Sequence, residues 1–191
     1  MYLRIDLLKD MTEQMKLDIR KAEINALNQV GKEAKKFAAD ELSSVYNIQK
    51  REINQAMWVE KARAGDLRLN LMVVQKGKIP LKKFSPQKTG TGVSVEIIKG
   101  RRKTLLHSFM ATMPTSGKSI SAGHKGVFMR TGRFNFPEMG RYSGLTEREI
   151  IEEKFSNSIP EFFGKKHILN KIDEFVRRRL PELFNQERNK L

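Results

Sequence analysis

The sequence predicts an α+β fold with a long N-terminal helix, a small antiparallel β-sheet of about four strands and a C-terminal helix. Apolar residues recur at the three- and four-residue steps of a helix near both ends of the chain. Between about residues 67 and 130 they instead alternate with polar residues, as they do in half-buried strands. The chain has 191 residues, 39% of them hydrophobic, which is enough material to bury a core.

The first helix is predicted over residues 6–42, where one face is apolar and Lys, Glu and Gln lie between the apolar positions. These positions are Leu8, Met11, Met15, Ile19, Ala22, Ala26, Val30, Ala34, Phe37 and Ala38. An unbroken helix of this length measures roughly 55 Å. A compact domain of this size does not need such a long helix, so we expect part of it to contact a neighbouring subunit.

A helical corner is predicted next, with a second helix capped by Asn47. Residues 38–57 also suggest a DNA-reading helix-turn-helix, but their turn lacks glycine, and the β-rich sequence that follows offers no three-helix core. We therefore favour a corner that packs inward. The predicted organisation is a helical arm and corner over residues 1–60, an antiparallel β core with a short helix over residues 61–163, and the C-terminal helix over residues 164–191.

The predicted β core begins where the spacing of apolar residues changes to two. A loop with two prolines, residues 77–86, separates the first strand from the second. The second and third strands form a hairpin whose turn is Lys99-Gly100-Arg101-Arg102-Lys103. The four predicted strands cover residues 67–73, 93–97, 104–112 and 124–130.

Helical signals return near the C-terminus. Thr146, with Glu149 three residues later, has the pattern of a capping box and predicts a short helix up to Phe155. Helical spacing then predicts the C-terminal helix, which Pro181 should kink or restart. Its apolar positions are Ile168, Ile172, Phe175, Val176, Leu180, Leu183 and Phe184.

Positive charge is the strongest bulk signal in the sequence. The chain carries 37 Lys and Arg residues against 22 Asp and Glu, a net charge of +15 and a pI of about 10.1. Such an excess favours a polyanionic partner, either nucleic acid or an acidic protein surface. We predict that Lys99, Arg101, Arg102 and Lys103, at the tip of the hairpin, face DNA; a solvated turn is the alternative.

The sequence predicts no catalytic site, metal site or cofactor. Ser116-Gly117-Lys118-Ser119 matches the second half of the phosphate-binding pattern G-x-x-x-x-G-K-[ST], but position 112 is a threonine and no helix is expected to follow. We interpret this segment as a turn between strands; a phosphotransfer enzyme or nuclease would instead depend on Lys118. The histidines, at positions 107, 124 and 167, have no companion ligands at i+3 or i+4.

The chain contains no cysteine, which excludes a disulfide framework and thiolate metal sites and fits an intracellular or virion protein. Its N-terminal residues lack the apolar segment of a secretory signal. The apolar runs are only a few residues long, so we expect neither export nor a membrane span.

Several segments, in this order along the chain, resemble the minor tail protein Z family of tailed bacteriophages. They are Ile79-Pro80-Leu81 with Phe84, Gly92–Val95 leading to Lys99–Lys103, Phe109, and Gly123-His124-Lys125-Gly126-Val127-Phe128-Met129-Arg130. The long helix running into Tyr46-Asn47-Ile48 and the Ser158-Ile159-Pro160 segment also match, so the resemblance spans nearly the whole chain. Two departures are Ser156-Asn157, where the family has Gly-Pro, and a longer, more aromatic link over residues 131–148.

The resemblance implies a non-enzymatic structural protein of a long-tailed phage or prophage. Such a tail-completion or head–tail joining protein acts at the head-proximal end of the tail, in or beside a sixfold ring of copies. The implied partners are tail tube, tail terminator, tape measure or connector proteins, with non-specific contact to genomic DNA. Assembly would occur in the host cytoplasm, and the protein would remain in the virion tail. The structural residues of the motif are Gly123, His124, Lys125, Gly126, Phe128, Ile159 and Pro160.

Overall fold

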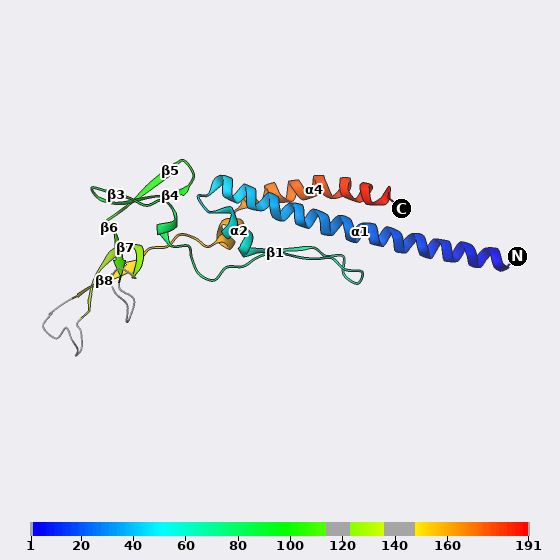
Figure 1. Ribbon diagram of the computed structural model, residues 1–191, viewed down its shortest axis with the longest axis horizontal. Helices are drawn as coiled ribbons and strands as arrows, with labels where there is room; N and C mark the ends of the chain where they lie inside the picture. The colour runs from blue at the N-terminus through cyan, green and yellow to red at the C-terminus, as the bar shows by residue number, and fades with distance from the viewer. Residues whose placement is uncertain (1, 114–122, 136–147, 191) are drawn as a thin grey trace. The chain divides into compact units, whose positions relative to one another are not determined.

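The computed structural model of the chain describes residues 2–113, 123–135 and 148–190. It confirms the α+β class, with a long N-terminal helix, antiparallel sheets and a C-terminal helix (Figure 1). The strands form three small sheets rather than one sheet of about four strands. The chain divides into two compact units. The first, here called the helical unit, holds Met1–Ser43, Gln49–Gln75 and Ile159–Leu191; the second, the sheet unit, holds Ser44–Ile48 and Lys76–Ser158.

The helical unit is framed by α1 (Tyr2–Val45) and α4 (Lys166–Arg188), which lie side by side (Figure 1). The sequence of α1 is rich in Ala, Leu, Lys and Glu, all strong helix formers. Contacts between the helices recur at multiples of four residues on each helix, which is the spacing of one helical face. Along α1 they pair Asn25 with Glu187, Glu33 with Arg179, Phe37 with Phe175, and Glu41 with Lys171. The two helices are therefore antiparallel and in a fixed register.

Small residues line the face of α1 that packs in the helical unit. The buried ones are Ala22, Ala26, Ala34, Ala38 and Ala39. Ala26, Val30 and Leu183 form a fully buried cluster, against which Leu180 packs. This packing carries α4 through Pro181 without interruption, so the predicted restart at that proline is wrong.

A two-stranded antiparallel ribbon completes the helical unit with α3 (Ile159–Phe163). Its strands are β1 (Met57–Glu60) and β2 (Asn70–Val73). The ribbon lies close to α1 because position 31 is glycine: a Cβ there would lie 2.5 Å from Leu69 Cδ1 and 3.0 Å from Val59 Cγ1. The sequence does not predict β1, because its residues follow a helical segment without a turn signal.

The helical corner exists, but its details differ from the prediction. Gln49, not Asn47, precedes α2 (Lys50–Ala56), and no side chain caps this helix. The second helix has seven residues and leads directly into β1, while Ile53 is fully buried. Because a recognition helix needs length and an exposed face, this geometry does not favour the helix-turn-helix alternative.

The sheet unit contains two three-stranded antiparallel sheets, with strand orders β3-β4-β5 and β6-β7-β8. The strands of the first sheet are β3 (Gln87–Thr89), β4 (Gly92–Ile98) and β5 (Arg101–Leu106). Those of the second are β6 (Ser108–Met113), β7 (His124–Asn135) and β8 (Arg148–Glu153). The predicted strand over residues 93–97 thus lies in β4, and the strand predicted over residues 124–130 lies in β7.

Two predictions in this region are wrong. Residues 104–112 do not form one strand, because His107 adopts a left-handed conformation, with φ of 57°, and separates β5 from β6. The short helix predicted up to Phe155 is replaced by β8, whose residues pair with β7 from Phe128↔Glu153 to Asn135↔Arg148. Pairing with β7 outweighs the local capping signal; Thr146 itself lies outside the described residues.

The core of the sheet unit gathers apolar residues from several elements. The buried members include Ile79, Leu81, Phe84, Val93, Val95, Val127 and Phe128. Backbone hydrogen bonds join the turn η1 (Leu81–Lys83) to the second sheet, since Leu81 N donates to Lys154 O and Lys154 N donates to Val127 O. The hairpin formed by β4 and β5 is therefore part of a packed core, to which β4 contributes Val93 and Val95.

Candidate nucleic-acid interface

The basic hairpin turn is tighter than the sequence predicts. Ile98 pairs directly with Arg101, so Lys99 and Gly100 alone connect β4 to β5. Gly100 has a φ of +74°, a conformation that side chains disfavour and glycine adopts freely. Arg101, Arg102 and Lys103 consequently lie in strand β5, and residues 99–103 together are called the basic turn below.

A β-bulge beside the turn decides where the cations point. Val95 pairs with Lys103 and Ile98 with Arg101, so two residues of β4, Glu96 and Ile97, lie opposite the single residue Arg102. Successive side chains of a strand point to opposite faces. Arg101 and Lys103 therefore share one face of β5, and Arg102 points to the other.

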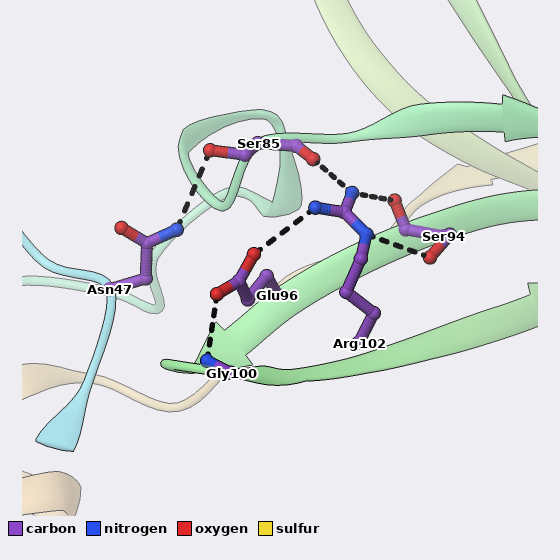
Figure 2. A network of polar contacts seen from close by, with 6 residues as sticks. All are labelled: Asn47, Ser85, Ser94, Glu96, Gly100 and Arg102. Carbon is purple, nitrogen blue, oxygen red and sulfur yellow. Dashed lines mark hydrogen bonds and ion pairs between the residues drawn. The ribbon is translucent and has the colours of Figure 1, made fainter.

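Arg102 is held by a network of hydrogen bonds (Figure 2). Its Nε donates to Ser94 Oγ at 3.2 Å, and its Nη1 donates to Glu96 Oε2 at 3.1 Å. Its Nη2 donates to the carbonyl oxygens of Ser85, at 2.6 Å, and Ser94, at 3.3 Å. The other carboxylate oxygen of Glu96 accepts a hydrogen bond from Gly100 N at 2.8 Å. Arg102 thus fixes the turn in place, and its guanidinium is already occupied.

The network continues to the segment that enters the sheet unit (Figure 2). Asn47 Nδ2 donates to Ser85 Oγ at 3.4 Å, and Asn47 N donates to Ile97 O at 2.9 Å. Lys99 N donates to Val45 O at 3.0 Å. Ser85 has a φ of 46°, an unusual conformation for a residue with a side chain, and its carbonyl accepts the hydrogen bond from Arg102. Hydrogen bonds from other segments of the sheet unit therefore hold both ends of the bulge in place.

The other three cations of the turn are exposed. The side chains of Lys99, Arg101 and Lys103 make neither a hydrogen bond nor an ion pair within the part of the chain that the structure describes. A rigid turn with three unengaged cations suits contact with phosphate groups, which carry charge but no sequence information. The four predicted residues thus divide into three that can contact DNA and one that positions them.

The motif Gly123–Gly126 joins three elements of the sheet unit. His124 Nε2 lies 2.8 Å from each carboxylate oxygen of Glu153 in β8, and Lys82 Nζ lies 3.4 Å from His124 Nδ1. A Cβ at Gly126 would lie 2.7 Å from Glu153 Oε1, so glycine leaves room for this carboxylate to reach His124. Lys125 is exposed.

The remaining motif residues lie in packed positions. Phe128 is buried and its ring centroid lies 6.2 Å from that of Phe109, its partner in β6. Ile159, in the helical unit, is buried at the start of α3, and its N–H donates to Gln75 Oε1 at 2.8 Å. Pro160 follows in the first turn of α3, where a missing N–H costs no helical hydrogen bond.

The residues that hold Arg102 escape prediction from sequence. One signal is their opposite charge: Glu96 lies in a predicted strand and Arg102 in the predicted turn beside it, and in the structure they form a cross-strand pair of the kind that stabilises sheets. Ser85 gives no such signal, because it contributes its backbone carbonyl from a loop.

The described ranges hold no candidate metal site. There, no group of three or more His, Cys, Asp or Glu residues is placed to hold a metal ion. The segment Ser116–Ser119, with Lys118, lies outside the described residues. No helix within residues 2–113, 123–135 and 148–190 has the length and apolar character needed to cross a membrane.

The chain matches a known protein family. A family model described as prophage minor tail protein Z (GPZ) matches residues 5–134, which include α1, the basic hairpin and the Gly123–Gly126 motif. No curated protein and no solved structure matches the chain.

Proposed function

The chain belongs to the prophage minor tail protein Z family, as its sequence predicts, and we propose that it completes the phage tail at its head-proximal end and joins the tail to the head. Family membership makes the protein a structural component of a phage tail that contacts other tail proteins. The partners we propose are the tail tube, tail terminator, tape measure or connector proteins. Assembly takes place in the host cytoplasm, and the finished protein resides in the virion tail.

The proposed assembly is a ring of six copies around the path of the DNA. The observation that supports contact with DNA is the basic turn, where Lys99, Arg101 and Lys103 are exposed on a hairpin fixed by Arg102. A protein at the end of a packaged genome meets any sequence, and cations that contact phosphates suit this requirement. The net charge of +15 adds a general attraction to DNA.

Complementation of a phage that lacks this gene tests the proposal. Without the protein, electron microscopy should find filled heads and tails that are not joined, and the wild-type protein should restore joined particles. Joined, infectious particles formed in the absence of the protein would contradict a role in head–tail joining.

A charge-reversal variant separates joining from DNA contact. Glutamate at Lys99, Arg101 and Lys103 should yield joined particles that form fewer plaques, because DNA would meet repulsion at the turn. The matched control places glutamate at Lys88, Lys125 and Arg133, which are exposed cations elsewhere in the sheet unit. Failure of the first variant to join heads to tails would show instead that the turn contacts an acidic protein.

A further inference from the structure

The N-terminal part of α1 extends beyond the elements that cover the rest of the helix (Figure 1). By the register of the α1–α4 contacts, in which Asn25 meets Glu187, the last residue of α4 lies opposite residue 24 of α1. On the other side, the loop between β1 and β2 reaches α1 as far as Arg20, whose Nη2 donates to Ala64 O at 3.2 Å. N-terminal to Arg20, the described residues of α1 make no hydrogen bond or ion pair with another element of the helical unit.

This overhang, defined here as residues 13–21, leaves apolar side chains in water. Met15 is 62% exposed and Ile19 is 41% exposed. On a helix of 3.6 residues per turn, both lie on the same face as Ala22 and Ala26, which are buried. The face that packs inside the helical unit therefore continues past the end of its cover.

An open apolar groove lies beside the root of the overhang. Its volume is about 480 Å³. The lining comes from α1, α4 and the β1–β2 loop: Glu23, Ala26, Leu27, Leu67, Leu180, Pro181 and Phe184. Only one of these side chains, that of Glu23, is charged, so the groove suits an apolar partner.

The overhang cannot fill the groove of its own chain. Both belong to the same continuous helix, and the groove begins at Glu23, immediately after the overhang. A helix cannot fold back on itself over so few residues, because consecutive residues rise by about 1.5 Å along a nearly straight axis. An overhang can therefore enter this groove only from another copy of the chain.

We propose that the overhang of one copy lies in the groove of a second copy, with Met15 and Ile19 against Leu180, Pro181 and Phe184. Every copy offers one overhang and one groove, so contacts of this kind can link copies head-to-tail, and a closed ring covers all of them. The inference deepens the proposed function, because it rests on the ring proposed there.

The charge of the overhang also favours a second copy over a polyanion as its partner. Within the overhang, Lys16 pairs with Glu13 at 2.8 Å and Lys21 with Asp18 at 3.1 Å. These pairs leave the segment with little net charge, that of Arg20 alone, in a chain of net charge +15. Two copies can therefore approach through this segment with little like-charge repulsion.

Cross-linking of single-cysteine chains tests the contact, since the natural sequence has no cysteine. Chains carrying Met15→Cys are mixed with differently tagged chains carrying Pro181→Cys and treated with a short bis-maleimide. We expect a cross-linked pair with both tags. Leu17→Cys is the matched control, because Leu17 is 57% exposed on the opposite face of the helix. Equal cross-linking of Leu17→Cys, or none of Met15→Cys, would overturn the proposal.

Sedimentation of the same proteins separates this contact from the ring. A closed ring without the Met15–Pro181 cross-link overturns the docking but leaves the proposed function standing. Cross-linked pairs that never close into a ring support the docking and contradict the ring. Glutamate at Met15 and Ile19 should weaken self-association at least about tenfold, whereas Leu17→Glu should leave it unchanged. Circular dichroism must show that both variants remain folded.

Discussion

Removal of the three exposed cations of the basic turn should change how DNA binding depends on salt. The perturbation is glutamine at Lys99, Arg101 and Lys103, which deletes charge without adding repulsion. Each phosphate contact contributes about 0.9 to the slope of log K against log salt. Three contacts therefore contribute about 2.7, which corresponds to a loss of affinity of about 40-fold between about 50 and about 200 mM salt. The variant should lack this part of the dependence.

Fluorescence anisotropy with a labelled DNA duplex, repeated at several salt concentrations, measures the slope. A second duplex of unrelated sequence should bind equally well, because phosphate contacts carry no sequence information. The melting temperature should remain that of the wild type, since none of the three side chains is engaged within the described residues.

The control variant carries glutamine at Lys88, Lys125 and Arg133 and loses the same net charge elsewhere in the sheet unit. An equal change of slope in both variants would show that the overall charge of the chain, not the turn, attracts DNA. A slope that changes in neither variant would refute the reasoning from the hairpin altogether.

Three further predictions concern stability. Arg102→Ala should lower the free energy of unfolding by about 1–2 kcal/mol, and Arg102→Lys should recover little of this loss because lysine lacks the forked donors of arginine. Urea denaturation measures both variants, and an unchanged free energy of unfolding for Arg102→Ala would contradict the role of the hydrogen-bond network. Phe128→Asp should cost about 3–5 kcal/mol and Lys125→Ala less than about 0.5 kcal/mol in the same assay, and equal losses would reject the core assignment. Hydrogen bonding to Arg179 lowers the pKa of Glu33 below its ordinary value of 4.5. The ionised carboxylate of Glu33 therefore stabilises the fold above pH 4.5, and this contribution is lost as the pH falls through the lowered pKa. Melting curves between about pH 6 and pH 3 should fall less steeply for Glu33→Gln than for the wild type, and parallel curves would exclude this contribution.

The elements with strong and long periodicity could be predicted from the sequence. Alanines at four-residue steps from Ala22 to Ala38 indicate the buried face of α1, and the structure buries them. The apolar positions of α4 are equally informative, and the strand predicted around Val93 and Val95 exists, although Ser94 between them is buried as well. In each case the pattern extends over several turns or several strand positions, so a single exception does not alter it.

The elements that depend on distant partners could not be predicted. Residues 148–153 are charged at both ends and follow a capping signal, yet they form a strand because β7 offers a pairing edge. The left-handed conformation of His107 likewise breaks a segment whose alternation is otherwise continuous. Neither feature has a local cause that sequence spacing reveals, since both depend on the backbone of another segment.

The basic turn shows the same limit at the level of single residues. Arg101, Arg102 and Lys103 are consecutive cations that the sequence does not distinguish, but alternation along β5 gives them different roles. Arg102 reaches Ser85 and Ser94, where hydrogen bonds occupy its guanidinium. Because Arg102 holds the turn and does not contact DNA, its substitution should lower the stability of the fold, and DNA binding should weaken only as a consequence. The order of these two effects distinguishes a positioning arginine from a DNA-contacting one in any variant series across the turn.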